Sequence, residues 1–207
     1  MAAQTKWTSL AVIPRTYGPD AASIYTTPVL PDLTIGVLRR EFSSRINSSA
    51  EFVRKKLHPS VCANEAPLAL RWKPSCHRSE VLLPAAAPDL LADPEWLLQH
   101  YERAELHDQP ALLLTVKVTQ REPGPLHGFW ERSREFARSE FVDRRGLPTV
   151  IAMHVPSLSP SRSPGKAHVH ALVLARTLNE HGFGALQQLD GHTMRASVAD
   201  AWLATAA

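Results

Sequence analysis

Three histidines stand on either side of a polar segment rich in proline and serine, His154 before it and His168 and His170 after it. The last two alternate with apolar residues, in a stretch that is typical of a β-strand. Because alternate residues of a strand point to the same face, His168 and His170 share one face while Val169 and Ala171 occupy the other. A neutral imidazole is a common ligand of divalent metal ions, so this spacing is the first candidate for chemistry in the chain.

His154 belongs to a second predicted strand, 149–155. If this strand pairs with the predicted strand 167–175, His154 lies beside the other two histidines on one face of the sheet. Three neutral imidazoles would hold a divalent cation and leave coordination positions open for substrate oxygens. The alternative is a group of solvated surface histidines at the end of a hairpin, because roughly half of all chains with 10 His in 207 residues would contain one H-x-H pair by chance.

The two cysteines offer a weaker candidate. Cys62, Cys76 and His77 contain ligand atoms for zinc, but their spacing is irregular and does not favour a zinc site. Two cysteines without a C-x-x-C motif form no disulfide framework, which favours a reducing cytoplasm. The N-terminal residues lack the pattern of a secretory signal, and the absence of a run of about 18 apolar residues predicts no membrane-spanning helix.

Composition and charge indicate the class of protein and the kind of partner. A chain of 207 residues with 44% apolar and 21% charged residues is typical of one soluble globular domain, 1–207. The net charge is only +3, yet residues 38–58 carry six Lys or Arg against two Glu. This local excess suits contacts with the phosphates of nucleic acid, although a solvated helix face explains it equally well.

The helices and strands that must position the histidines are predicted from the spacing of apolar residues and from the positions of Gly, Pro and helix-capping residues. The predicted strands are 10–13, 80–84, 111–118, 149–155 and 167–175, and the predicted helices are 36–57, 94–107, 128–146 and 193–207. Asp93 and Pro94 form a helix start, Gly146 is a natural helix end, and the Pro/Ser-rich loop 156–166 excludes regular structure. The predicted class is α+β, with an antiparallel sheet that carries the His cluster on one face and helices packed on the other.

Three segments, residues 77–108, 129–154 and 166–184, resemble in that order the MobA/MobL family of mobilisation relaxases, including TraA-type proteins. This family belongs to the HUH endonucleases. The last segment is the most specific, because in the family a His-apolar-His strand precedes an Arg and a Gly-Phe-Gly, which here are Arg176 and residues 182–184. His154 occupies the place of a third family histidine. The resemblance spans about half the chain, and the N-terminal part, 1–79, diverges from the family.

The resemblance implies a definite chemistry and a relaxase-like fold. Relaxases of this family nick one DNA strand at a transfer origin with a tyrosine that becomes joined to the 5′ phosphate. The resemblance implies a divalent ion, Mg²⁺ or Mn²⁺, on His154, His168 and His170, where it polarises the scissile phosphate. The implied partners are single-stranded or locally melted DNA and accessory mobilisation proteins, with no membrane and no small-molecule substrate. The residues expected to contact DNA are Arg39, Arg40, Arg45, Arg54, Lys55, Lys56, Lys166 and Arg176.

The nucleophile is the least determined residue. The family places its tyrosine near the N-terminus, after a segment rich in Ser and Ala, and Tyr25 follows such residues here. Tyr17, which stands before a Gly-Pro turn, is the rival candidate. For both tyrosines the alternative is an ordinary half-buried side chain without a catalytic role. In the family the strand that matches 112–118 often carries acidic residues, but Leu114 and Val116 are apolar.

The sequence therefore leaves two candidate functions of different class. The first is an active metal-dependent DNA strand transferase that initiates plasmid or mobile-element mobilisation. The second is a non-catalytic or degenerate DNA-binding accessory protein on the same scaffold. A three-histidine zinc hydrolase is disfavoured, because no glutamate stands beside the histidine pair to act as a base.

Overall fold

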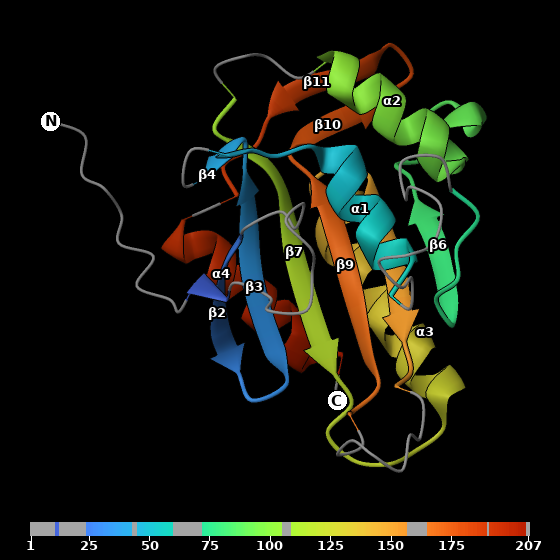
Figure 1. Ribbon diagram of the computed structural model, residues 1–207, viewed down its shortest axis with the longest axis vertical. Coiled ribbons are helices and arrows are strands. Elements are labelled where there is room, and N and C mark those ends of the chain that lie inside the picture. Colours follow the sequence, from blue (N-terminus) through green and yellow to red (C-terminus); the bar gives the residue numbers. More distant parts are fainter. Residues whose placement is uncertain are drawn as a thin grey trace, which may run out of the picture.

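The computed structural model (Figure 1) describes residues 11–12, 24–42, 45–59, 72–104, 109–156, 165–189 and 191–205. Its centre is a seven-stranded antiparallel sheet in the order β1-β2-β3-β7-β9-β8-β6. These strands are β1 (Ala11–Val12), β2 (Ile24–Leu30), β3 (Leu33–Arg39), β6 (Arg78–Leu82), β7 (Ala111–Thr119), β8 (Thr149–His154) and β9 (His168–Leu174). Two hairpins stand apart from it, β4 (Glu41–Phe42) with β5 (Arg45–Ile46) and β10 (Arg176–Asn179) with β11 (Gly182–Leu186).

Four α-helices complete the described fold: α1 (Ser49–Leu57), α2 (Pro94–Ala104), α3 (Leu126–Ala137) and α4 (His192–Ala204). A short 3₁₀ helix (Asp89–Ala92) precedes α2, and a π-helical turn (Arg138–Asp143) continues α3. The predicted helix start before α2 is confirmed, since Asp93 Oδ1 accepts hydrogen bonds from the backbone N–H of Glu95 and Trp96 at 2.8 and 3.1 Å. Gly146 adopts a φ of +67° shortly after the π-helical turn, a conformation that glycine tolerates without strain.

The two faces of the sheet bury separate apolar clusters, and the predicted α+β class is confirmed. Behind the sheet (Figure 1), α3 and α4 cover the face that includes Val169 and Val173. On the other face lie the histidines, where α1 and α2 pack against Leu172 and Leu174. Helices therefore lie on both faces, and the face that carries the His cluster is partly covered rather than open. Among the described helices, none is long and apolar enough to cross a membrane.

The predicted helix over 36–57 is wrong in its first half. Leu33, Ile35 and Val37 alternate with residues of the other face, and β3 pairs with both β2 and β7 near the middle of the sheet. The helix begins only at Ser49, after Ser48 accepts a hydrogen bond from the N–H of Glu51. Over so short a stretch, cross-strand pairing outweighed the apolar spacing that suggested a helix.

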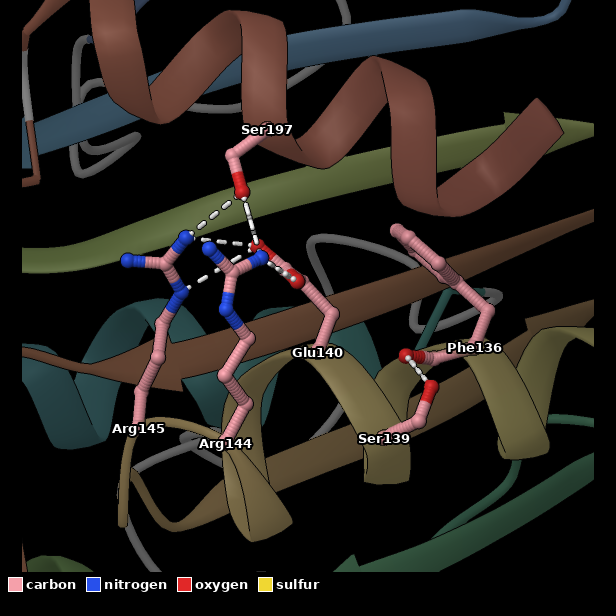
Figure 2. Close-up of polar contacts among 6 residues, drawn as sticks. All are labelled: Phe136, Ser139, Glu140, Arg144, Arg145 and Ser197. Carbon is pink, nitrogen blue, oxygen red and sulfur yellow. Dashed lines mark hydrogen bonds and ion pairs between the residues drawn. The ribbon is translucent and has the colours of Figure 1, made fainter. Parts of the chain in front are cut away.

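A buried carboxylate joins α4 to the end of α3. Glu140 lies in the π-helical turn and is only 2% exposed. Figure 2 shows its carboxylate enclosed by Arg144, Arg145 and Ser197. The ion pairs measure 2.9 Å to Arg144 Nη1 and 2.6 Å to Arg145 Nη2, and Ser197 Oγ donates to Glu140 Oε1 at 2.8 Å. Because Ser197 belongs to α4, this network anchors the C-terminal helix beneath the sheet.

Candidate metal centre

The pairing of β8 with β9 brings the three predicted histidines together. His154 and His168 are direct cross-strand neighbours, and His170 lies two residues farther along β9 on the same face. The ring centroids are separated by 5.0 Å for His154–His168, 4.9 Å for His154–His170 and 5.1 Å for His168–His170. One ligand nitrogen from each ring lies within 4.8 Å of the other two. The predicted pairing of these strands is confirmed, and the rings can surround one ion.

Backbone carbonyls orient two of the three rings. His154 Nε2–H donates to the Lys56 carbonyl at 2.6 Å, and His168 Nδ1–H donates to the Lys166 carbonyl at 3.0 Å. A nitrogen that donates is protonated, so the lone pair of each neutral ring lies on Nδ1 of His154 and on Nε2 of His168. Metal-binding histidines are usually held in this way, by a hydrogen bond from the nitrogen that does not bind the metal.

His170 supplies an independent test of whether these residues fit a metal. Its side chain is buried, and its Nδ1 atom has no hydrogen-bond partner among the described residues. A buried polar atom without a partner is costly, and a bound cation would satisfy such a ring. Three imidazoles without a carboxylate form a donor set that suits a divalent transition metal and leaves positions for oxygen ligands. The residues therefore fit a divalent ion.

Burial keeps the three imidazoles neutral. It lowers the pKa of His168 to about 4, lowers the pKa of His170 well below its usual value, and lowers the pKa of His154. The positive charges of Lys56 and Lys117 act in the same direction on all three rings. Burial also lowers the pKa of Lys56 to about 8. At neutral pH the ring lone pairs are therefore available to a metal ion.

These shifts predict that the metal-free protein loses stability on acidification. In the unfolded chain His168 takes up a proton near pH 6.5, whereas in the folded protein it does so only near pH 4. Between these values the unfolded state binds more protons, so the free energy of unfolding falls as the pH is lowered. Urea unfolding with a chelator at pH 7.0, 5.5 and 4.5 measures this loss, and His168→Gln should lose less stability than the parent. Equal pH dependence in the two proteins would contradict the shift.

The predicted DNA-binding residues divide into two groups. Lys56 and Lys166 lie at the His cluster, since their backbone carbonyls accept the hydrogen bonds from His154 and His168. Lys166 is exposed, and its Nζ donates to the Arg121 carbonyl at 3.0 Å. On α1, Lys55 pairs with Glu51, and the Arg54 guanidinium lies 5.2 Å from the centroid of the Trp72 ring.

The other predicted cations lie at the far end of the sheet. Arg39 ends β3 and Arg40 follows it, beside the start of β7 and about 20 Å along the strands from His170. The backbone of Arg45 lies in β5. Arg176 donates to Gln109 Oε1 at 3.0 Å and to the Gly184 carbonyl at 2.8 Å. Arg176 and the Gly-Phe-Gly segment thus build the β10–β11 hairpin, in which Phe183 packs edge-on against Tyr101.

The backbone of Tyr25, the predicted nucleophile, lies in β2, three strands away from β9. Tyr25 is the cross-strand neighbour of Val37 in β3, and Val37 in turn pairs with Leu114 in β7. His170 pairs instead with Lys117, three residues farther along β7. The three strand spacings from β2 to β9 amount to about 14 Å. Tyr17 and Cys62 lie outside the described residues. In the described part of the chain, the three histidines are the only group that could hold a metal, and Cys76 and His77 do not join it.

Lys117 is the functional candidate that the sequence interpretation missed. It pairs directly with His170 across β7 and β9, and it shares the face of the His cluster. The signal was present, because Lys117 is the only charged residue in the apolar strand 111–119. Its relevance depends on the register with β9, which the sequence does not provide.

The comparisons with known proteins give structural likenesses but no match in sequence. No protein-family model and no curated protein matches the chain. A solved structure that describes the molecular basis of vancomycin resistance transfer in Staphylococcus aureus is similar, with a TM-score of 0.53 and 18% identity over 64% of this chain and 68% of that chain. This likeness concerns the fold alone, and membership of the MobA/MobL family stays a prediction. The chain therefore has an α+β fold similar to that of this solved structure, with a histidine cluster on its central sheet.

Proposed function

We propose that this protein is a metal-dependent DNA relaxase that nicks and rejoins one strand at a transfer origin during plasmid or mobile-element mobilisation. The observation that carries the proposal is the group of three oriented, neutral imidazoles on the central antiparallel sheet. The structural likeness to a protein of vancomycin resistance transfer supports it. Single-stranded or locally melted DNA is the proposed partner, and Mg²⁺ or Mn²⁺ is the proposed cofactor.

The chemistry assigns a role to each group of residues. A divalent ion on the three histidines would polarise the non-bridging oxygens of the scissile phosphate. The Tyr25 hydroxyl would pass its proton to water as its oxygen attacks phosphorus. The bond from phosphorus to the 3′ oxygen breaks, that oxygen takes up a proton, and the 5′ phosphate stays on the tyrosine. Lys56 adds positive charge beside the His cluster, where the DNA backbone would lie, and the exposed Lys166 adds a further charge close to it in sequence.

A non-catalytic DNA-binding accessory protein is the second candidate, and the position of Tyr25 favours it. The separation of about 14 Å between β2 and β9 is too large for a direct attack at the His cluster without rearrangement of the N-terminal strands. The described face near the histidines also presents Lys117 and Thr119 from β7, neither of which is a carboxylate base.

The deciding experiment looks for a covalent protein–DNA adduct. The protein is incubated with Mn²⁺ and labelled single-stranded oligonucleotides from its own gene neighbourhood, and the products are separated on a denaturing gel. We expect an adduct that Tyr25→Phe reduces at least about a thousandfold, because phenylalanine has no nucleophilic oxygen. Tyr17→Phe serves as the matched control and should retain the adduct. If the oligonucleotides bind but no adduct forms, the accessory function is the correct one.

A further inference from the structure

Lys117 has the placement of a ligand-binding cation. It stands near the end of β7, which lies between β3 and β9 (Figure 1), and its cross-strand neighbours are Thr34 and His170. It therefore belongs to the face that carries the His cluster. The side chain is half-buried, yet it makes no ion pair and no hydrogen bond with any other residue that the structure describes. A half-buried ammonium group without an anionic partner in the described part of the protein keeps its donors available for an anionic ligand.

The charge of Lys117 reaches all three histidines. It lowers the pKa of His154, His168 and His170, after the larger effect of burial, which agrees with the direct cross-strand pairing of Lys117 with His170. Lys56 acts on the same rings from α1. Among the described residues no carboxylate contributes to the pKa of the three rings or of Lys117. A metal ion here would add positive charge to a site that already carries lysine, and this arrangement requires an anion.

We propose that Lys117 Nζ binds one non-bridging oxygen of the phosphate group whose other non-bridging oxygen faces the three histidines. This inference rests on the proposed metal site and names phosphate as the ligand chemistry. Directly opposed residues of antiparallel strands have Cβ atoms about 5 Å apart, which suits two groups that share one phosphate. Lysine binds phosphate as a compact point charge and needs no fixed angular geometry.

Removal of this charge should move two affinities in opposite directions. In Lys117→Gln, Mn²⁺ should bind about threefold to tenfold more tightly, because one repulsive charge is gone. Inorganic phosphate should bind the Mn²⁺-loaded variant about tenfold more weakly, because a charge-assisted contact is lost. Calorimetry measures Mn²⁺ binding, and broadening of the ³¹P resonance by the bound Mn²⁺ measures phosphate binding. Lys73→Gln removes the same charge from an exposed lysine and should change neither affinity.

The outcomes separate this inference from the proposed function. If the parent protein binds no Mn²⁺, the metal site and the role of Lys117 are both wrong. If the parent binds Mn²⁺ and Lys117→Gln binds phosphate as tightly as the parent, only the role of Lys117 is overturned. A parallel fall of both affinities together with a lower melting temperature would assign Lys117 a structural role instead. Lys117→Arg retains the charge and should keep most of the phosphate affinity, which confirms that charge is the cause.

Discussion

The double substitution His168→Ala and His170→Ala is expected to lower the Mn²⁺ affinity at least about a hundredfold, because it removes two of three imidazole ligands. The remaining ring, His154, keeps its hydrogen bond to the Lys56 carbonyl but cannot hold the ion alone. Each removed ring is neutral at neutral pH, so the loss reflects missing ligand atoms rather than a change in charge. Isothermal titration calorimetry on chelator-treated protein measures the effect.

A matched control removes two imidazoles from the surface. The side chains of His127 and His181 are 78% and 85% exposed, and neither belongs to the His cluster. His127→Ala with His181→Ala should therefore leave the Mn²⁺ affinity unchanged. Equal Mn²⁺ affinity in the parent and in the His168 and His170 double variant would place the metal elsewhere or exclude it from the site. Loss of affinity in both double variants would indicate nonspecific binding by surface imidazoles.

The second large effect is expected at Glu140. Glu140→Ala should lower the free energy of unfolding by about 1–3 kcal/mol, because it leaves the donors of Arg145 and Ser197 without their carboxylate acceptor. Arg145 is the more affected partner, since its side chain is only 19% exposed, whereas that of Arg144 is 60% exposed. The hydrogen bond from Ser197 on α4 is lost in the same substitution. Urea unfolding monitored by circular dichroism measures the change.

Glu131→Ala is the matched control for this prediction. Glu131 belongs to α3 and contacts Arg78 at 3.4 Å, but both side chains are more than 40% exposed. An exposed pair of this kind contributes about 0–1 kcal/mol, so the control should unfold nearly as the parent does. A similar loss of stability in the two variants would show that the Glu140 network does not anchor α4. Glu140→Gln should lie between the parent and Glu140→Ala, because the amide keeps a hydrogen-bond acceptor but not the charge.

Local features of the chain were predicted well where the physics is local. The alternation of His168 and His170 with apolar residues placed both rings on one face, because the period of a strand is two. The start of α2 followed from Asp93, whose side chain accepts hydrogen bonds within its own turn. The apolar stripe of α3 followed from helical spacing, although the π-helical turn at its end did not.

Errors arose where the decisive contacts join distant parts of the chain. Residues 36–48 belonged to the predicted helix 36–57, but the first of them form part of the central strand β3, which pairs with β2 and β7. The DNA contact of Arg176 stays a prediction, and the sequence did not show that Gln109 and Gly184 accept hydrogen bonds from its guanidinium. A basic residue count reports charge, and it cannot report which charges the fold has already paired.

Three features follow from local sequence patterns: two imidazoles share a strand face, α2 begins at Pro94, and the chain combines helices with an antiparallel sheet. The rest of the site depends on contacts between distant strands. Only the register of β8 and β7 against β9 brings His154 and Lys117 beside His168 and His170. Register depends on side-chain packing and turn geometry over the whole sheet, and a shift of one residue would move every side chain of a strand to the opposite face.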